Sequence, residues 1–140
     1  MDVGNRNGWT ATQVVPAREI VERIDAVFPL ESVPRQYHSE TALRYRYKDG
    51  SGEIGLIASV SMPFCTDCSR MRLSPEGVMY TCLFATEGVD LKTPLRAGAT
   101  DAEIQALIRN TWTARSDRYS EIRSEAKTQS HKIEMYYIGG

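Results

Sequence analysis

The sequence lacks any hydrophobic run of the roughly 18 residues needed to cross a bilayer, and its first residues are polar and glycine-rich. It also lacks an excess of either charge, because 17 basic side chains face 18 acidic ones and the net charge is -1. A balanced chain has no long-range field with which to attract nucleic acid or an anionic membrane surface. We therefore expect a cytoplasmic protein that binds neither nucleic acid nor membrane.

Cysteine and histidine are scarce, with three and two residues among 140. An odd number of cysteines in a chain without an export signal does not build a disulfide framework. Internal repeats and low-complexity tracts are absent as well, and a single domain usually takes about 100 to 200 residues. The sequence thus predicts one globular unit, in which the spacing of the cysteines needs another explanation.

Hydrophobic periodicity predicts two main helices. The first has Pro16 in its first turn and stops at Pro29, and the second begins at a capping box of Thr100 and Glu103. A single helical turn is expected at residues 93–94. The apolar positions that repeat at helical spacing are Ile20, Val21, Ile24, Val27 and Phe28 in the first helix and Ile104, Leu107, Ile108 and Trp112 in the second.

Two hairpins are predicted between these helices, which makes the fold class α+β. Alternating residues 43–48, a turn, and the β-rich residues 53–60 form the first hairpin. Residues 70–74 and 78–83 flank a Pro75-Glu76-Gly77 turn in the second. The remaining expectations are a connection over residues 30–41, a mobile or partner-dependent segment over 115–132 and a short strand over 135–138.

Cys65, Cys68 and Cys82 form a C-x2-C-x13-C pattern and are the only cysteines in the chain. A C-x2-C pair on a tight turn directs two thiolates toward one point, and the return strand of the second hairpin brings the third beside them. Pro63 and Phe64 hold the turn and supply an apolar wall that limits solvent access. The spacing is typical of a metal site.

Other interpretations of the cysteines stay open at this point. Cys65 and Cys68 fit a redox dithiol, although such pairs usually accompany a βαβ pattern, and all three fit ordinary buried thiols. Structural zinc wants four ligands, and neither His38 nor His131 has finger-like spacing. An iron–sulfur cluster held by three thiolates would keep one iron open for a substrate.

Arg70 and Arg72 follow the C-x2-C pair two residues apart. In an extended segment they project to the same side as Cys68, and two guanidinium groups beside a metal centre form a good receptor for a polyphosphate. The alternative is that they are solvated strand residues that pair with Asp67 and Glu76. An adjacent cluster favours the first interpretation.

Residues 64–73 read FCTDCSRMRL and are followed by Gly77 and by Cys82-Leu83-Phe84. They resemble the C-terminal cluster motif of the GTP 3',8-cyclase family of molybdenum cofactor biosynthesis, whose members are radical S-adenosylmethionine (SAM) enzymes. The resemblance covers essentially the whole chain, and the Gly-Gly terminus supports it independently. The further matching segments are residues 1–5, 95–98, 117–120 and 137–140.

The resemblance implies a C-terminal [4Fe-4S] cluster whose free iron binds the purine of GTP. Its ligands map to the three cysteines. The R-x-R that contacts GTP maps to Arg70, Met71 and Arg72, with Met71 acting through its backbone.

The resemblance also implies roles for both ends of the chain. Met1 falls where a family methionine lies near SAM. Gly139 and Gly140 fall on a tail that enters the active site, where the lack of side chains allows close backbone approach. In the family, a radical made from SAM at a second [4Fe-4S] cluster abstracts the ribose 3' hydrogen of GTP, and C3' then bonds to purine C8.

The sequence departs from the family in one respect, since no cysteine precedes Cys65 and the C-x3-C-x2-C motif of the radical-generating cluster is missing. We therefore expect residues 1–140 to be the C-terminal [4Fe-4S]-cluster and GTP-binding domain, without the N-terminal part of the incomplete (α/β) barrel and inactive alone. Apolar surface left uncovered should cause self-association, a homodimer included. Two other hypotheses are a zinc-stapled interaction module without catalysis and a regulatory module that binds GTP without metal.

Overall fold

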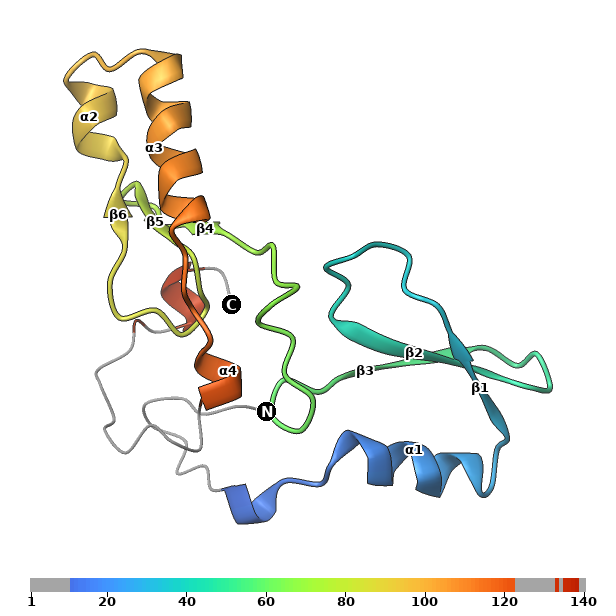
Figure 1. Ribbon diagram of the computed structural model, residues 1–140. Coiled ribbons are helices and arrows are strands. Elements are labelled where there is room, and N and C mark those ends of the chain that lie inside the picture. The colour runs from blue at the N-terminus through green and yellow to red at the C-terminus, as the bar shows by residue number, and fades with distance from the viewer. Residues whose placement is uncertain (1–10, 123–132, 134, 139–140) are drawn as a thin grey trace.

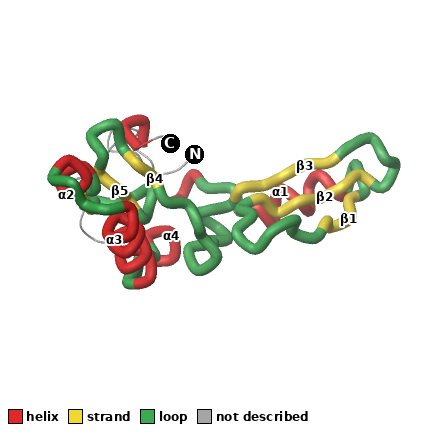
Figure 2. Tube along the Cα trace, turned by 90° about the horizontal axis from the view of Figure 1, so that it is seen from above, coloured by secondary structure: helices red, strands yellow, loops and turns green. Residues whose placement is uncertain are grey.

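The computed structural model describes residues 11–122, 133 and 135–138. Two small antiparallel sheets and several short helices lie at the two ends of an elongated molecule, joined by an irregular stretch that contains the C-x2-C pair (Figures 1 and 2). The α+β class predicted from the sequence is confirmed. Within these described ranges, no helix is long and apolar enough to span a membrane.

The sheet lobe, residues 11–57, contains the first sheet, helix α1 and a short 3-10 helix. Helix α1 (Ala17–Asp25) begins directly after Pro16, which is its N-cap and not, as predicted, a residue of its first turn. The sheet has the strand order β1-β2-β3, and the ring of Phe28, after the helix, meets Tyr47 edge-on at 6.2 Å. Bounds of the other elements are Ala11–Gln13 for the 3-10 helix η1, Leu30–Val33 for β1, Ala42–Tyr47 for β2 and Glu53–Ile57 for β3.

Strand β1 corrects the sequence-based expectation that residues 30–41 only connect. Its four residues show no clear alternation, but they pair with β2 in the register Leu30↔Tyr47 to Val33↔Arg44. Leu30 is buried at 7% exposure, and its amide donates to Asp25 Oδ1 at 2.7 Å. The strand therefore depends on its partner rather than on its own pattern.

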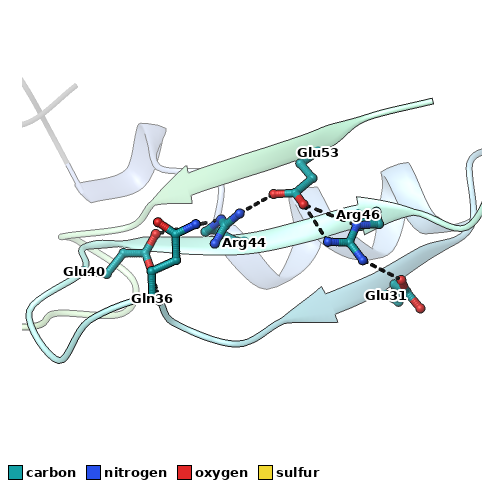
Figure 3. Close-up of polar contacts among 6 residues, drawn as sticks. All are labelled: Glu31, Gln36, Glu40, Arg44, Arg46 and Glu53. Atoms are coloured by element: carbon teal, nitrogen blue, oxygen red, sulfur yellow. Dashed lines mark hydrogen bonds and ion pairs between the residues drawn. The ribbon is translucent and has the colours of Figure 1, made fainter. Parts of the chain in front are cut away.

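A ladder of ion pairs covers the face of this sheet that points away from α1 (Figure 3). Arg44 and Arg46 both bind Glu53, at 2.5 and 2.9 Å, and the hydrogen bond from Arg46 is the main reason that the pKa of Glu53 lies below its usual value. Glu31 lies 3.7 Å from Arg46, and Glu40 lies 3.9 Å from Arg44. This face is charged, with three carboxylates paired to two guanidinium groups.

The helical lobe, residues 72–122, contains the second sheet, in the order β4-β5-β6, with Met79 fully buried at its centre. The capping box of Thr100 and Glu103 is present at the start of α3, as predicted. The apolar stripe of α3 is only half-buried, because no element of the described structure covers it completely. The elements are β4 (Arg72–Leu73), β5 (Val78–Tyr80), β6 (Val89–Asp90), α2 (Lys92–Arg96), α3 (Asp101–Thr113) and α4 (Tyr119–Ile122).

One further expectation for the C-terminal region is wrong. Met135–Ile138 forms a 3-10 helix, η2, instead of a strand, and this turn buries Ile138 while Tyr136 stays 80% exposed. The start of the segment expected to be mobile or partner-dependent, residues 115–122, contains α4 and makes part-buried contacts. Residues 123–132 lie outside the described residues.

Large apolar side chains remain open to solvent on both lobes, as shown by Val27 at 68%, Ile57 at 67% and Leu73 at 60% exposure. Between α1 and β3 lies an open groove of about 630 Å³, which Ile20, Leu56 and neighbouring side chains line. Exposed apolar surface of this kind is typical of an interaction site. Self-association stays a prediction.

The turn between β4 and β5 requires glycine at position 77. Gly77 has a φ of +79°, and a Cβ there would lie 2.8 Å from Lys92 Cβ, whereas Gly50, with a φ of +78°, has open space around it. We expect Gly50→Ala to lower the free energy of unfolding by roughly 1–2 kcal/mol, the cost of left-handed backbone strain. Gly77→Ala should lower it further, because the new Cβ also clashes with Lys92. Urea unfolding of the two variants measures the difference, and equal losses would contradict it.

Candidate metal centre

The three cysteines lie on two turns that flank the second hairpin. The cysteine loop, residues 64–70, connects the two lobes, and its first turn is closed by the Cys68 amide donating to the Cys65 carbonyl at 3.3 Å. Cys82 follows β5 rather than lying on it, in a turn closed by the Ala85 amide at 3.3 Å. All three thiols are free and half-buried. The charges of Cys65 and Cys68 contribute to the raised pKa of the Cys82 thiol, so the three sulfurs lie near enough to interact electrostatically.

Arg70 lies directly beside one of the thiols. Its Nε donates to Cys68 Sγ at 3.4 Å, and its guanidinium stacks over the Phe64 ring at 4.9 Å. Burial alone would raise the pKa of Cys68, but hydrogen bonds from the Arg70 backbone and side chain and the charges of Arg70 and Arg115 outweigh it. The net result is a lowered thiol pKa, which favours the thiolate that binds metal.

Cys82 has the opposite tendency. Burial raises the pKa of this thiol, and the negative charge of Asp117 and the other two cysteines raise it further, while the Phe84 amide, which donates to Sγ at 3.4 Å, works against the shift. A third thiolate is therefore costly here unless a positive centre compensates it. A bound metal centre supplies such compensation.

A largely buried arginine, two residues after the end of α3, holds the cysteine loop. Arg115 donates to the carbonyls of Cys68 and Cys65, at 2.5 and 2.8 Å, and its side chain is only 12% exposed. Its guanidinium lies 4.7 Å from the centre of the Trp112 ring and 3.5 Å from Asp117, which accepts from the Thr81 hydroxyl at 2.6 Å. The sequence analysis missed this residue, because its partners lie 47 and 50 positions away.

The carboxylates that the alternative interpretation assigns to Arg70 and Arg72 have other partners. Asp67 binds Arg35 at 2.7 Å and His38 at 3.4 Å, and Glu76 bonds to Tyr137. Within the described part of the chain, neither Arg70 nor Arg72 forms an ion pair with a carboxylate.

Arg72 donates from Nη1 to the Arg70 carbonyl at 3.4 Å. Burial, followed by the neighbouring Arg70 charge, lowers the pKa of Arg72. Two like charges are thus held close together beside the thiols.

The donor set fits an iron–sulfur cluster in its chemistry: three free thiols on adjoining turns, with two guanidinium groups and an amide N–H around them. Among the described residues, no three His, Cys, Asp or Glu side chains are grouped so as to hold a single metal ion. His38, the zinc ligand considered above, is 84% exposed and lies against Asp67. Met1, His131, Gly139 and Gly140 lie outside the described residues.

The contrast between Cys68 and Cys82 predicts an order of thiol reactivity in metal-free protein. At neutral pH we expect Cys68 to be alkylated before Cys82, since a lowered pKa leaves more thiolate at a given pH. Arg70→Gln should move the alkylation midpoint of Cys68 to higher pH, and Arg109→Gln on the exposed side of α3 should not. Mass spectrometry after iodoacetamide pulses across a pH series gives both midpoints, and identical midpoints for Cys68 and Cys82 would refute the expectation.

Comparison with known proteins places the chain in a family. Residues 1–121 match the family Molybdenum Cofactor Synthesis C. The GTP 3',8-cyclase of Synechococcus sp. (strain CC9605) is 51% identical over 140 residues, which cover 100% of this chain and 39% of that protein. The corresponding enzymes of Acidothermus cellulolyticus and Xanthomonas axonopodis pv. citri are 46% identical over 165 residues and 45% over 140, covering 100% of this chain and 46% and 41% of those proteins. The chain spans less than half the length of these curated relatives, and it belongs to the Molybdenum Cofactor Synthesis C family.

Proposed function

We propose that this chain is the cluster-binding and GTP-binding part of a cytoplasmic GTP 3',8-cyclase, the radical SAM lyase that begins molybdenum cofactor biosynthesis. The relatives that match its full length carry that name. The observation that carries the proposal is the contact between Arg70 Nε and Cys68 Sγ at 3.4 Å. Arg70, which has no acidic partner among the described residues, thus contacts a thiol whose pKa is lowered.

Cys65, Cys68 and Cys82 would hold a [4Fe-4S] cluster, which supplies an iron without a protein ligand as the attachment point for the purine. Three thiolates bring negative charge into a half-buried site, and the positive charges of Arg70 and Arg115 offset part of it. The amide of Phe84 donates to Cys82 and stabilises that thiolate in the same way. These groups make the site suitable for an anionic centre.

Arg70 and Arg72 would bind the phosphates of GTP. Partial burial, followed by repulsion from Arg70, lowers the pKa of Arg72, and a bound polyanion would offset that repulsion. Guanidinium groups match phosphate oxygens in geometry as well as in charge. Met71 lies between them with a side chain 41% exposed, which is compatible with a contribution from its backbone alone.

The radical chemistry is assigned to a part of the enzyme outside these 140 residues. The chain contains no C-x3-C-x2-C motif, so the second [4Fe-4S] cluster and most of the SAM site would lie elsewhere, and the chain alone would not cyclise GTP. Gly139 and Gly140 keep their proposed role as a tail that approaches the substrate, and Met1 its proposed place near SAM.

The alternative of a zinc-stapled module keeps one structural argument, because the imidazole of His38 lies next to the cysteine loop, 3.4 Å from Asp67. Such a module would bind a single ion and have no catalytic activity. Metal identity separates it from the main proposal.

Anaerobic reconstitution with ferrous iron and sulfide should give a brown protein with about four irons per chain. Cys65→Ser, Cys68→Ser or Cys82→Ser should each lose most of the iron, since the chain contains no other cysteine to replace the missing ligand. Iron and zinc analysis with visible absorption measures the outcome. One tightly held zinc without iron uptake would reject the cluster in favour of the zinc module.

Arg70→Ala and Arg72→Ala should weaken GTP binding while iron content stays unchanged. A charge-assisted contact contributes about 1.5–3 kcal/mol, so each variant should lose roughly tenfold to a hundredfold in affinity. Calorimetric titration of the reconstituted protein with GTP provides the measurement, and Arg109→Ala provides the control. Unchanged affinity in both variants would show that these arginines are surface residues. Binding of GTP to metal-free protein with equal affinity would favour the regulatory module.

A further inference from the structure

We propose that Arg115 is a positioning residue, which holds Cys65 and Cys68 in place through their backbone carbonyls. The inference rests on the three-thiolate cluster of the proposed function and assigns the residue that organises its binding loop. Its guanidinium reaches both carbonyls of the C-x2-C pair, at 2.8 and 2.5 Å, and thereby fixes the two ligand positions relative to each other.

The geometry is specific to arginine. A planar fork with several N–H groups can donate to two carbonyls and still approach Asp117, at 3.5 Å. Lysine is a point charge on a flexible stem and cannot reproduce this arrangement. The Trp112 ring, 4.7 Å from the guanidinium carbon, supports the fork from the end of α3.

The same network reaches the third cysteine. Asp117 binds Arg115 and also accepts from the hydroxyl of Thr81, the residue before Cys82. Arg115 and Asp117 thus connect the cysteine loop with the turn that carries Cys82, two segments separated in sequence by the whole β4–β5 hairpin.

A second contact to the cysteine loop differs in kind. Arg35 binds the side chain of Asp67 at 2.7 Å, but the two side chains are 43% and 30% exposed, and exposed ion pairs contribute little. Arg115 is largely buried and binds backbone atoms, so its hydrogen bonds are protected from water. The loop is therefore held mainly from the side of α3.

Hydrogen exchange of the whole metal-free chain tests the hold on the loop without any cluster. In Arg115→Gln, the amide of Cys68, which donates to the Cys65 carbonyl within the loop, should exchange on the order of tenfold or more faster, since two charge-assisted hydrogen bonds that hold this turn are lost. Arg115→Lys should show most of this increase, and Arg109→Gln should match the wild type. Unchanged protection of residues 101–113 shows that α3 is intact in Arg115→Gln. If that protection is lost, Asp117→Asn is used in place of Arg115→Gln and should speed exchange in the loop by a smaller factor. Wild-type exchange in Arg115→Gln would overturn the proposal.

Measurements on reconstituted protein test whether the hydrogen bonds from Arg115 also stabilise the bound cluster. Arg115→Gln and Arg115→Lys should both lose iron to a chelator several-fold faster than wild type. Only Arg115→Gln should have a more negative reduction potential, because it alone loses the positive charge. If a variant exchanges faster in the loop but keeps its iron as long as wild type does, the claim that Arg115 supports cluster binding is overturned. If wild type takes up no iron, the proposed function fails, and the exchange data still decide whether Arg115 positions the loop.

Discussion

The two lobes meet at a loop whose backbone is fixed by one guanidinium group. Arg115 donates to the carbonyls of Cys65 and Cys68 from a largely buried position, so the residues that carry the thiols are linked to α3 rather than only to their neighbours in sequence. A turn of this kind has few backbone hydrogen bonds of its own, as the single closing bond at 3.3 Å illustrates. Its geometry therefore depends on a partner from outside the turn.

The electrostatics of the centre follow from the unequal surroundings of its sulfurs. Cys68 lies next to Arg70 and near Arg115, while Cys82 is more affected by burial and by Asp117. The first thiol therefore ionises more readily than the second. This difference in thiol pKa suits a centre in which Cys68 binds the metal first, as a thiolate, and the other thiols follow once the positive charge of the metal is nearby.

Several elements could be predicted from the sequence because their determinants are local. Thr100 and Glu103 are three residues apart and form a capping box, Pro16 sets the start of α1, and Gly77 makes the turn of the second hairpin. The C-x2-C spacing belongs to the same group, since it identifies candidate ligands without knowledge of the fold.

The elements that sequence analysis missed are those whose determinants are distant. Strand β1 exists because residue 30 pairs with residue 47, and the two-residue strand β6 exists because it pairs with β5. Arg115 stands in a polar stretch with no local signal, and its role appears only when the fold brings it to the cysteine loop. The turn of η2 likewise buries Ile138 instead of extending it along a sheet edge.

The sidedness of the first sheet constrains how the molecule can be assembled. Its outer face is occupied by paired guanidinium and carboxylate groups that gain little from losing their water (Figure 3). On the opposite side, Ile20 and Leu56 line an open groove of mixed polar and apolar character, whose apolar part gains free energy when it is covered. A polypeptide that packs against this lobe would therefore gain more free energy on the helix side than on the ion-pair ladder.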